Sequence, residues 1–108
     1  MKLHDRFEWD TKKALVNARK HHVRFETAAV MLSDDQGDVY HCETSDDAHS
    51  FEEDRTITTG SHPADRSVIL IVVWTERASK GKRITRIISA RAATAREREQ
   101  YVEKIRNR

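Results

Sequence analysis

The residues of this chain best suited to chemistry are a histidine, a glutamate and three arginines: His49, Arg55, Glu76, Arg86 and Arg91. A histidine or glutamate side chain can carry a proton to or from a reacting oxygen. A guanidinium matches phosphate oxygens with two-point geometry and stabilises charge that develops on them. Cleavage of RNA without a metal ion requires a base for the 2′-hydroxyl, a cation for the phosphate and an acid for the leaving 5′ oxygen. The five residues could supply these parts.

Arg86 stands in an apolar segment, where a regular strand would put it on one face with Ile84 and Ile88. A charge within a half-buried strand costs free energy unless it is paired or faces a site. One interpretation is therefore an ion pair with Glu76 or Glu53, and the other is a phosphate contact. The sequence leaves both open.

Further side chains near these candidates could hold RNA. Basic side chains would contact phosphates, and aromatic rings would stack on bases. Both aromatic residues have an alternative to an RNA contact. Trp74 could be a core residue of its strand, and the spacing of the C-terminal helix turns Tyr101 toward the core. The predicted RNA contacts are Trp74, Arg77, Lys82, Arg83 and Tyr101.

The sequence contains no clear motif for a metal site or a cofactor site. His21-His22 and His41-Cys42 are adjacent pairs, and zinc sites usually show wider ligand spacings. The sequence has no glycine-rich phosphate loop and no serine-centred nucleophile motif. We therefore expect neither a metal ion nor a cofactor.

Charge is unevenly distributed along the chain. Residues 34–54 hold nine acidic residues and no lysine or arginine, whereas residues 77–108 hold eleven basic and three acidic residues. The net charge of +2 conceals this asymmetry. A basic C-terminal third suits a phosphate backbone as partner, although a solvated helix with scattered arginines would look the same. The acidic stretch could meet a basic protein surface.

Length and composition predict one small domain over residues 1–108. The longest apolar run, Val68–Trp74, is too short to span a bilayer, and no signal-peptide apolar stretch follows Met1. Cys42 is the only cysteine, so no internal disulfide can form. We expect a protein of the bacterial cytoplasm without membrane association.

Local patterns predict a short strand at Phe7–Trp9 and then two helices. Asp10 is the expected N-cap of the first helix, which runs to about Lys20. Its inward positions would be Ala14, Leu15, Ala18 and His21 or His22. The second helix presents one apolar face, made of Phe25, Ala28, Ala29 and Leu32.

Strand patterns dominate the second half. The expected elements are a strand at Val39–Glu43, a loop at Thr44–Asp54, an edge strand at Arg55–Ser61, a central strand at Val68–Trp74, a hairpin turn at Ser79–Lys82, a return strand at Arg83–Ala90 and a helix from Thr94 toward Arg106. Thr94 and Glu97 fit a capping box, and Tyr101, Val102 and Ile105 would face the core. The sum is an α+β domain with a largely antiparallel sheet and its helices packed on one face.

Three groups of residues together resemble the BrnT family of toxins, the RelE-like ribonuclease halves of type II toxin–antitoxin pairs. The resemblance extends from about Phe7 to Tyr101. The groups are Phe7-Glu8-Trp9-Asp10 with Lys13-Ala14, Asn17, Lys20-His21, Val23, Phe25-Glu26 and Ala28; His49-Ser50 with Glu53-Asp54-Arg55 and Gly60-Ser61; and Thr75-Glu76-Arg77 with Arg86-Ile87-Ile88-Ser89-Ala90-Arg91, Ala93-Thr94, Glu97-Arg98 and Tyr101. The chain departs from the family at His22, where glycine is usual, and in a longer, more acidic loop before His49.

The resemblance implies a RelE-like fold with an antiparallel sheet of four to five strands, two N-terminal helices and one C-terminal helix. It also implies an endoribonuclease that cuts RNA without metal and inhibits translation. The family's strand arginine falls on Arg86, its closing arginine on Arg91 and its loop arginine on Arg55. The histidine falls on His49 and the strand-end acid on Glu76. All five are expected to line one groove.

The partner that the resemblance implies is a ribbon-helix-helix antitoxin of the BrnA type, which neutralises the toxin and binds operator DNA. The toxin itself would meet DNA only through that antitoxin. Two other functions remain open: a catalytically inactive module that acts as corepressor with its antitoxin, and a stand-alone RNA-binding protein. The presence of all five candidate residues favours the enzyme over the inactive module.

Overall fold

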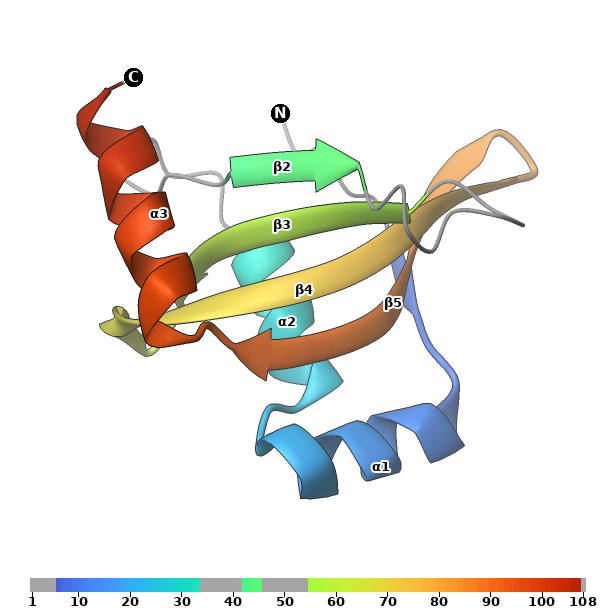
Figure 1. Cartoon of the computed structure of the whole chain (residues 1–108). Helices are drawn as coiled ribbons and strands as arrows, with labels where there is room; N and C mark the ends of the chain where they lie inside the picture. The colour runs from blue at the N-terminus through green and yellow to red at the C-terminus, as the bar shows by residue number, and fades with distance from the viewer. Residues whose placement is uncertain (1–5, 34–41, 46–54, 108) are drawn as a thin grey trace.

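The computed structural model describes residues 6–33, 42–45 and 55–107 (Figure 1). Its elements, in chain order, are β1 (Arg6–Glu8), α1 (Thr11–His21), α2 (Phe25–Ser33), β2 (Cys42–Ser45), β3 (Arg55–His62), β4 (Asp65–Ser79), β5 (Lys82–Ala92) and α3 (Ala95–Arg106). The predicted α+β class, with two N-terminal helices and one C-terminal helix, is confirmed.

The described strands form one five-stranded sheet in the order β1-β5-β4-β3-β2. β4 lies at its centre, as its apolar sequence predicted, and is antiparallel to both neighbours. β1 pairs with β5 in parallel, so the sheet is mixed. The expectation that Arg55–Ser61 is an edge strand was wrong, because β2 covers the other side of β3.

Capping residues mark both ends of α1, Asp10 at the N-terminus and His22 at the C-terminus. The Asp10 carboxylate accepts a hydrogen bond from the Lys13 backbone N–H at 3.0 Å, which satisfies a free donor of the first turn. At the other end His22 adopts the left-handed conformation with φ 58°, and its N–H donates to the Ala18 carbonyl. Glycine takes this conformation most readily, which explains physically why glycine suits the position that His22 occupies here.

The core lies between α2 and one face of the sheet. The predicted apolar face of α2 is confirmed, since Phe25, Ala28 and Leu32 are buried and Ala29 packs against them. Their partners across the sheet are Leu70, Val72 and Trp74 of β4 with Ile87 and Ala90 of β5. We call this the helix face of the sheet, and the opposite one the open face.

The inward side of α1 differs from the expectation. Leu15 is 58% exposed, whereas Asn17 is buried. The Asn17 amide donates to the Ala90 carbonyl at 2.8 Å and accepts from the Ala90 N–H at 3.1 Å; it also donates to the Val23 carbonyl. β1 pairs only with the first part of β5, so the backbone N–H and C=O groups farther along that strand have no partner strand on this side. An amide side chain can hydrogen-bond these groups, whereas leucine cannot.

The β4–β5 hairpin closes at the predicted turn. Lys80 and Gly81 both have positive φ, 52° and 78°. Two such residues match the right-handed twist of the strands that they join.

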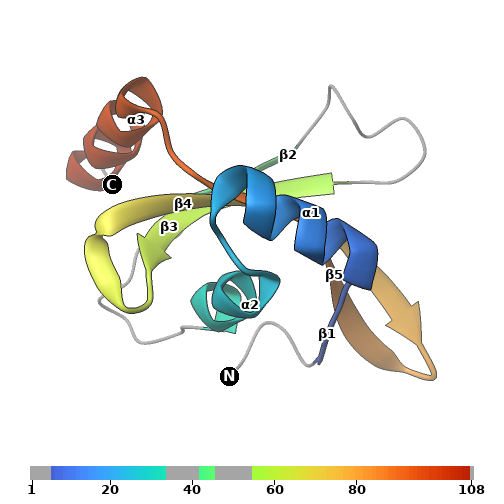
Figure 2. The same ribbon diagram turned by 90° about the horizontal axis from the view of Figure 1, so that it is seen from below.

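α3 lies on the other side of the sheet from α2, while α1 runs beside the β5 edge (Figures 1 and 2). The expectation that all helices pack on one face was therefore wrong. The predicted capping box is confirmed: Thr94 accepts from the Glu97 N–H, and Glu97 accepts from the Thr94 N–H. Within the described residues, no helix is long and apolar enough to cross a membrane.

Candidate active site

A β-bulge in β5 decides which arginines share a face. Val73 of β4 pairs with Ser89, but the next residue, Trp74, pairs with Ile87, so Ile88 is an extra residue on β5. In a regular strand, residues five apart point to opposite faces. The extra residue cancels this effect and brings Arg86 and Arg91 to the same face.

That face is the open one. Arg86 pairs with Thr75 and Arg91 with Ile71, and these two β4 residues are four apart, so they point the same way. The neighbouring Trp74 belongs to the core on the helix face. The same bulge corrects the expectation that Arg86 and Ile88 share a face.

A row of side chains crosses four strands on the open face. Glu8 of β1 pairs with Arg86 of β5, Arg86 with Thr75 of β4, and Thr75 with Arg55 of β3. We call Glu8, Arg86, Thr75 and Arg55 the arginine row. Neighbouring strands lie about 4.8 Å apart, so Arg86 and Arg55 start about 10 Å apart, a span that two long side chains can close around one phosphodiester.

Glu8 holds two arginines at once. Its Oε2 accepts from Arg86 Nη1 at 2.7 Å and from Arg77 Nη1 at 2.8 Å. The hydrogen bond from Arg86 is the main cause that lowers the pKa of Glu8, so this carboxyl is ionised at neutral pH. The three groups together carry one net positive charge, and Arg86 remains about one-third exposed. The cluster can therefore accept an anion.

Glu8 was not among the residues singled out from the sequence, and the ion-pair partners considered for Arg86 did not include it. Its signal was the alternation at Phe7-Glu8-Trp9. Phe7 and Trp9 pack against the core, which turns the residue between them to the open face.

Arg91 lies on the open face but meets a different carboxylate. Its two Nη atoms donate to the two oxygens of Glu97 at 2.7 and 2.8 Å. This bidentate pair, with the capping bonds to Thr94, lowers the pKa of Glu97 to about 2 and raises that of Arg91. Glu97 thus ties the end of β5 to the first turn of α3.

Glu76 does not join the arginine row. It pairs in register with Thr85, which puts it on the helix face beyond the core, and it forms an ion pair with Arg83. The expectation that Glu76 lines one groove with Arg55, Arg86 and Arg91 was therefore wrong. Strand alternation is the reason, because Glu76 is one residue from Thr75 of the row.

The two aromatic residues expected to contact RNA are buried. Trp74 is 6% exposed, and its indole N–H donates to the Thr58 hydroxyl at 2.9 Å. Tyr101 is 5% exposed on α3. Neither ring offers a face on which a base could stack. Both residues are therefore core residues, which was the alternative to an RNA contact. On the same helix Val102 is exposed, contrary to the expectation that it faces the core.

The remaining predicted residues lie in three places. Arg77 extends the arginine row through Glu8, whereas Lys82 and Arg83 are exposed on the β4–β5 hairpin. His49 lies outside the described residues. Among the residues that the structure describes, no cluster of three or more histidine, cysteine, aspartate or glutamate side chains could hold a metal ion.

The arrangement can bind a phosphate and stabilise extra negative charge on it. Arg86 is held in place by a carboxylate before any ligand arrives, so little reorganisation is needed when charge develops. Arg55 is half-buried across Thr75 from it.

Comparison with known families agrees with this chemistry. Residues 9–97 match the family described as ribonuclease toxin, BrnT, of type II toxin-antitoxin system. The chain belongs to this family. It is accordingly a ribonuclease toxin of a type II toxin–antitoxin pair, with an antitoxin as its partner. A search among curated proteins found no match. Arg55, Arg86 and Arg91 lie within the matched residues of the toxin, whereas Glu8 lies just before them.

Proposed function

We propose that the toxin cleaves RNA without a metal ion and that the arginine row is where the scissile phosphate binds. One observation carries this proposal: Arg86 is oriented by a carboxylate that it shares with Arg77, and Arg55 stands two strands away on the same face. Two guanidinium groups flanking one phosphate would stabilise the negative charge that develops during cleavage.

In this proposal Arg86 contacts the reacting phosphate, and Glu8 is a positioning residue that aims Arg86. An ionised carboxylate held by two arginines is a weak base, so we do not assign proton abstraction to Glu8. We assign proton transfer to His49, because an imidazole can carry a proton to or from a reacting oxygen. Glu76 is left out of the site because it lies on the other face with Arg83.

Cleavage of purified RNA in excess chelator tests the proposal. The wild type is compared with Arg86→Ala and with Arg83→Ala as matched control, since Arg83 is also a β5 arginine in an ion pair but lies on the other face. Cleavage by wild type and Arg83→Ala, with loss in Arg86→Ala, is the expected result. Equal cleavage by all three proteins would refute the role of Arg86, and cleavage that stops in chelator would refute metal independence.

No cleavage of free RNA by the wild type would point to the catalytically inactive corepressor or to a need for the ribosome. A translation extract distinguishes the two. We propose that the toxin inhibits protein synthesis there, so unchanged synthesis would favour the corepressor.

We further propose that the partner is a ribbon-helix-helix antitoxin of the BrnA type, that operator DNA is bound only through it, and that the pair acts in the bacterial cytoplasm. The absence of a possible internal disulfide fits a reducing compartment. Gel-shift measurements with the operator compare toxin alone, antitoxin alone and the complex. Binding by the toxin alone would contradict this part of the proposal.

A further inference from the structure

The outward side of α1 combines exposed apolar side chains with basic ones. Leu15 is 58% and Val16 61% exposed. Around them, at helical spacings of three and four residues, stand Lys12, Arg19 and Lys20, all exposed. α1 contains no acidic residue at all. We call this surface, Lys12, Leu15, Val16, Arg19 and Lys20, the α1 surface.

A hollow of about 300 Å³ continues this surface toward the sheet. Val16 and Ile88, the bulge residue of β5, are its apolar lining, and Lys12, Lys13, Lys20 and His21 form its polar lining together with Asn17. An apolar side chain of a partner could enter it while acidic neighbours meet the lysines.

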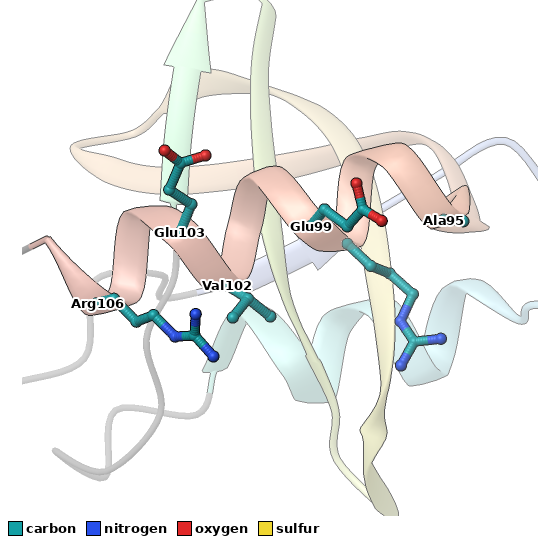
Figure 3. Close-up of a pocket in the computed structure, with 6 residues that line it drawn as sticks. Ala95, Glu99, Val102, Glu103 and Arg106 are labelled. Carbon is teal, nitrogen blue, oxygen red and sulfur yellow. The ribbon is translucent and has the colours of Figure 1, made fainter.

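A larger hollow of about 640 Å³ runs along α3, but its chemistry is less selective (Figure 3). Its charged lining consists of two glutamates and two arginines, Glu99, Glu103, Arg98 and Arg106, which offer no net sign. Val102 is the only large exposed hydrophobic residue among its lining residues. Charge complementarity therefore identifies a partner type for the α1 surface and not for α3.

We propose that the α1 surface is the docking site of an acidic segment of the antitoxin that carries apolar side chains. Neighbouring exposed apolar side chains rimmed by charged ones are typical of protein interaction sites, whereas contacts to nucleic acid are made mainly by charged and polar groups. A second copy of the toxin is disfavoured, because two such surfaces would bring lysines and arginines together. The inference rests on the antitoxin partner of the proposed function and adds where that partner binds.

Helix α1 lies beside the β5 edge (Figure 2), whereas the strand register puts the arginine row on the open face of the sheet. Substitutions on the α1 surface should weaken the antitoxin complex without changing RNA cleavage by the free toxin. This separation makes the inference testable independently of catalysis.

The experiment measures the Kd of the full toxin for the antitoxin encoded with it. Val16→Glu is compared with Val30→Glu, since Val30 is 55% exposed on the neighbouring helix α2 and is not part of the α1 surface. The double variant Lys12→Glu/Lys20→Glu is compared with Lys104→Glu/Arg106→Glu on α3. We expect Val16→Glu and the α1 double variant to raise Kd at least about tenfold, because both put negative charge against an acidic partner, and the controls to stay near the wild type.

Four results would overturn the inference, the last of them by refuting the partner on which it rests. An unchanged Kd for both α1 variants, with a wild type that binds, would refute the α1 surface alone. A higher KM for RNA with unchanged antitoxin affinity would make it an RNA contact, and a wild-type dimer that Val16→Glu dissociates would make it a contact between copies. A wild type that cleaves RNA but does not bind the antitoxin would refute the proposed partner itself.

Discussion

Two arginines of one strand, Arg86 and Arg91, lie on the same face and each meets a glutamate, yet their environments differ. Glu8 divides one carboxylate oxygen between Arg86 and Arg77, which leaves positive charge in excess. Both oxygens of Glu97 accept hydrogen bonds from one arginine, Arg91. The first arrangement is ready for a further anion, whereas the second is neutral and its guanidinium is already matched.

The difference teaches that an arginine's role depends on how much of its charge is already compensated. Glu97 also accepts the Thr94 N–H of the capping box, so the pair with Arg91 fastens α3 to the end of β5. We therefore propose that Arg86 contacts RNA and that Arg91 has mainly a structural role. Four predictions test this contrast, from the largest effect to the smallest.

Arg86→Ala should lower kcat/KM for RNA about 100-fold or more, because it removes a pre-oriented donor to the reacting phosphate. Arg91→Ala should change kcat/KM by less than about tenfold in protein that is still folded, since its charge is already compensated. Steady-state cleavage assays, with a thermal melt of each variant, measure both. Equal losses for the two variants would remove the contrast.

Glu8→Gln should lower kcat about tenfold while KM falls. The amide no longer fixes Arg86 by charge, so orientation is lost, and one negative charge near the RNA disappears. Glu8→Asp keeps the charge and should restore part of kcat. A Glu8→Gln enzyme with unchanged kcat and KM would show that Glu8 does not position Arg86.

Glu97→Ala should lower the free energy of unfolding by about 1–2 kcal/mol, because the capping bond and the pair with Arg91 are lost together. Urea denaturation measures the change. Glu99→Ala, an exposed α3 residue one turn from the cap, is the control and should be nearly neutral. If Glu97→Ala has unchanged stability but reduced cleavage, Arg91 and Glu97 would belong to the catalytic site.

Acid should destabilise the wild type partly through Glu97. Its pKa in the folded protein, about 2, lies below the ordinary value of 4.5. The stabilisation is therefore fully present above pH 4.5 and is lost as the pH falls from 4.5 toward 2. Urea midpoints between pH 6 and 3 should decline less steeply for Glu97→Gln than for the wild type. Parallel declines would contradict the lowered pKa.

The sequence predicted the elements whose signals are local. The Asp10 cap, the capping box at Thr94, the turn at Lys80-Gly81 and the apolar face of α2 depend on residues within a few positions of each other. Such local signals predict well because the local preferences of a natural sequence mostly agree with its overall fold.

The site was less predictable because its contacts are long-range. Glu8 and Arg86 are 78 residues apart and meet only because β1 joins the sheet edge in parallel. The prediction of the inward side of α1 was wrong because Asn17 is buried to hydrogen-bond the backbone of Ala90 in β5. The residue pattern within the helix contains no signal for this long-range contact. His49 remains a prediction, since it lies outside the described residues.

The bulge at Ile88 has a consequence for how relatives of this chain should be aligned and engineered. Deleting the extra residue, Ile88, would leave Arg86 and Arg91 four positions apart in a regular strand, and both would still point to the open face. Keeping all residues but pairing them without a bulge would instead turn one of the two arginines to the helix face. A related sequence that lacks one residue here should therefore be aligned with its gap at the bulge, where the common face of the two arginines is preserved.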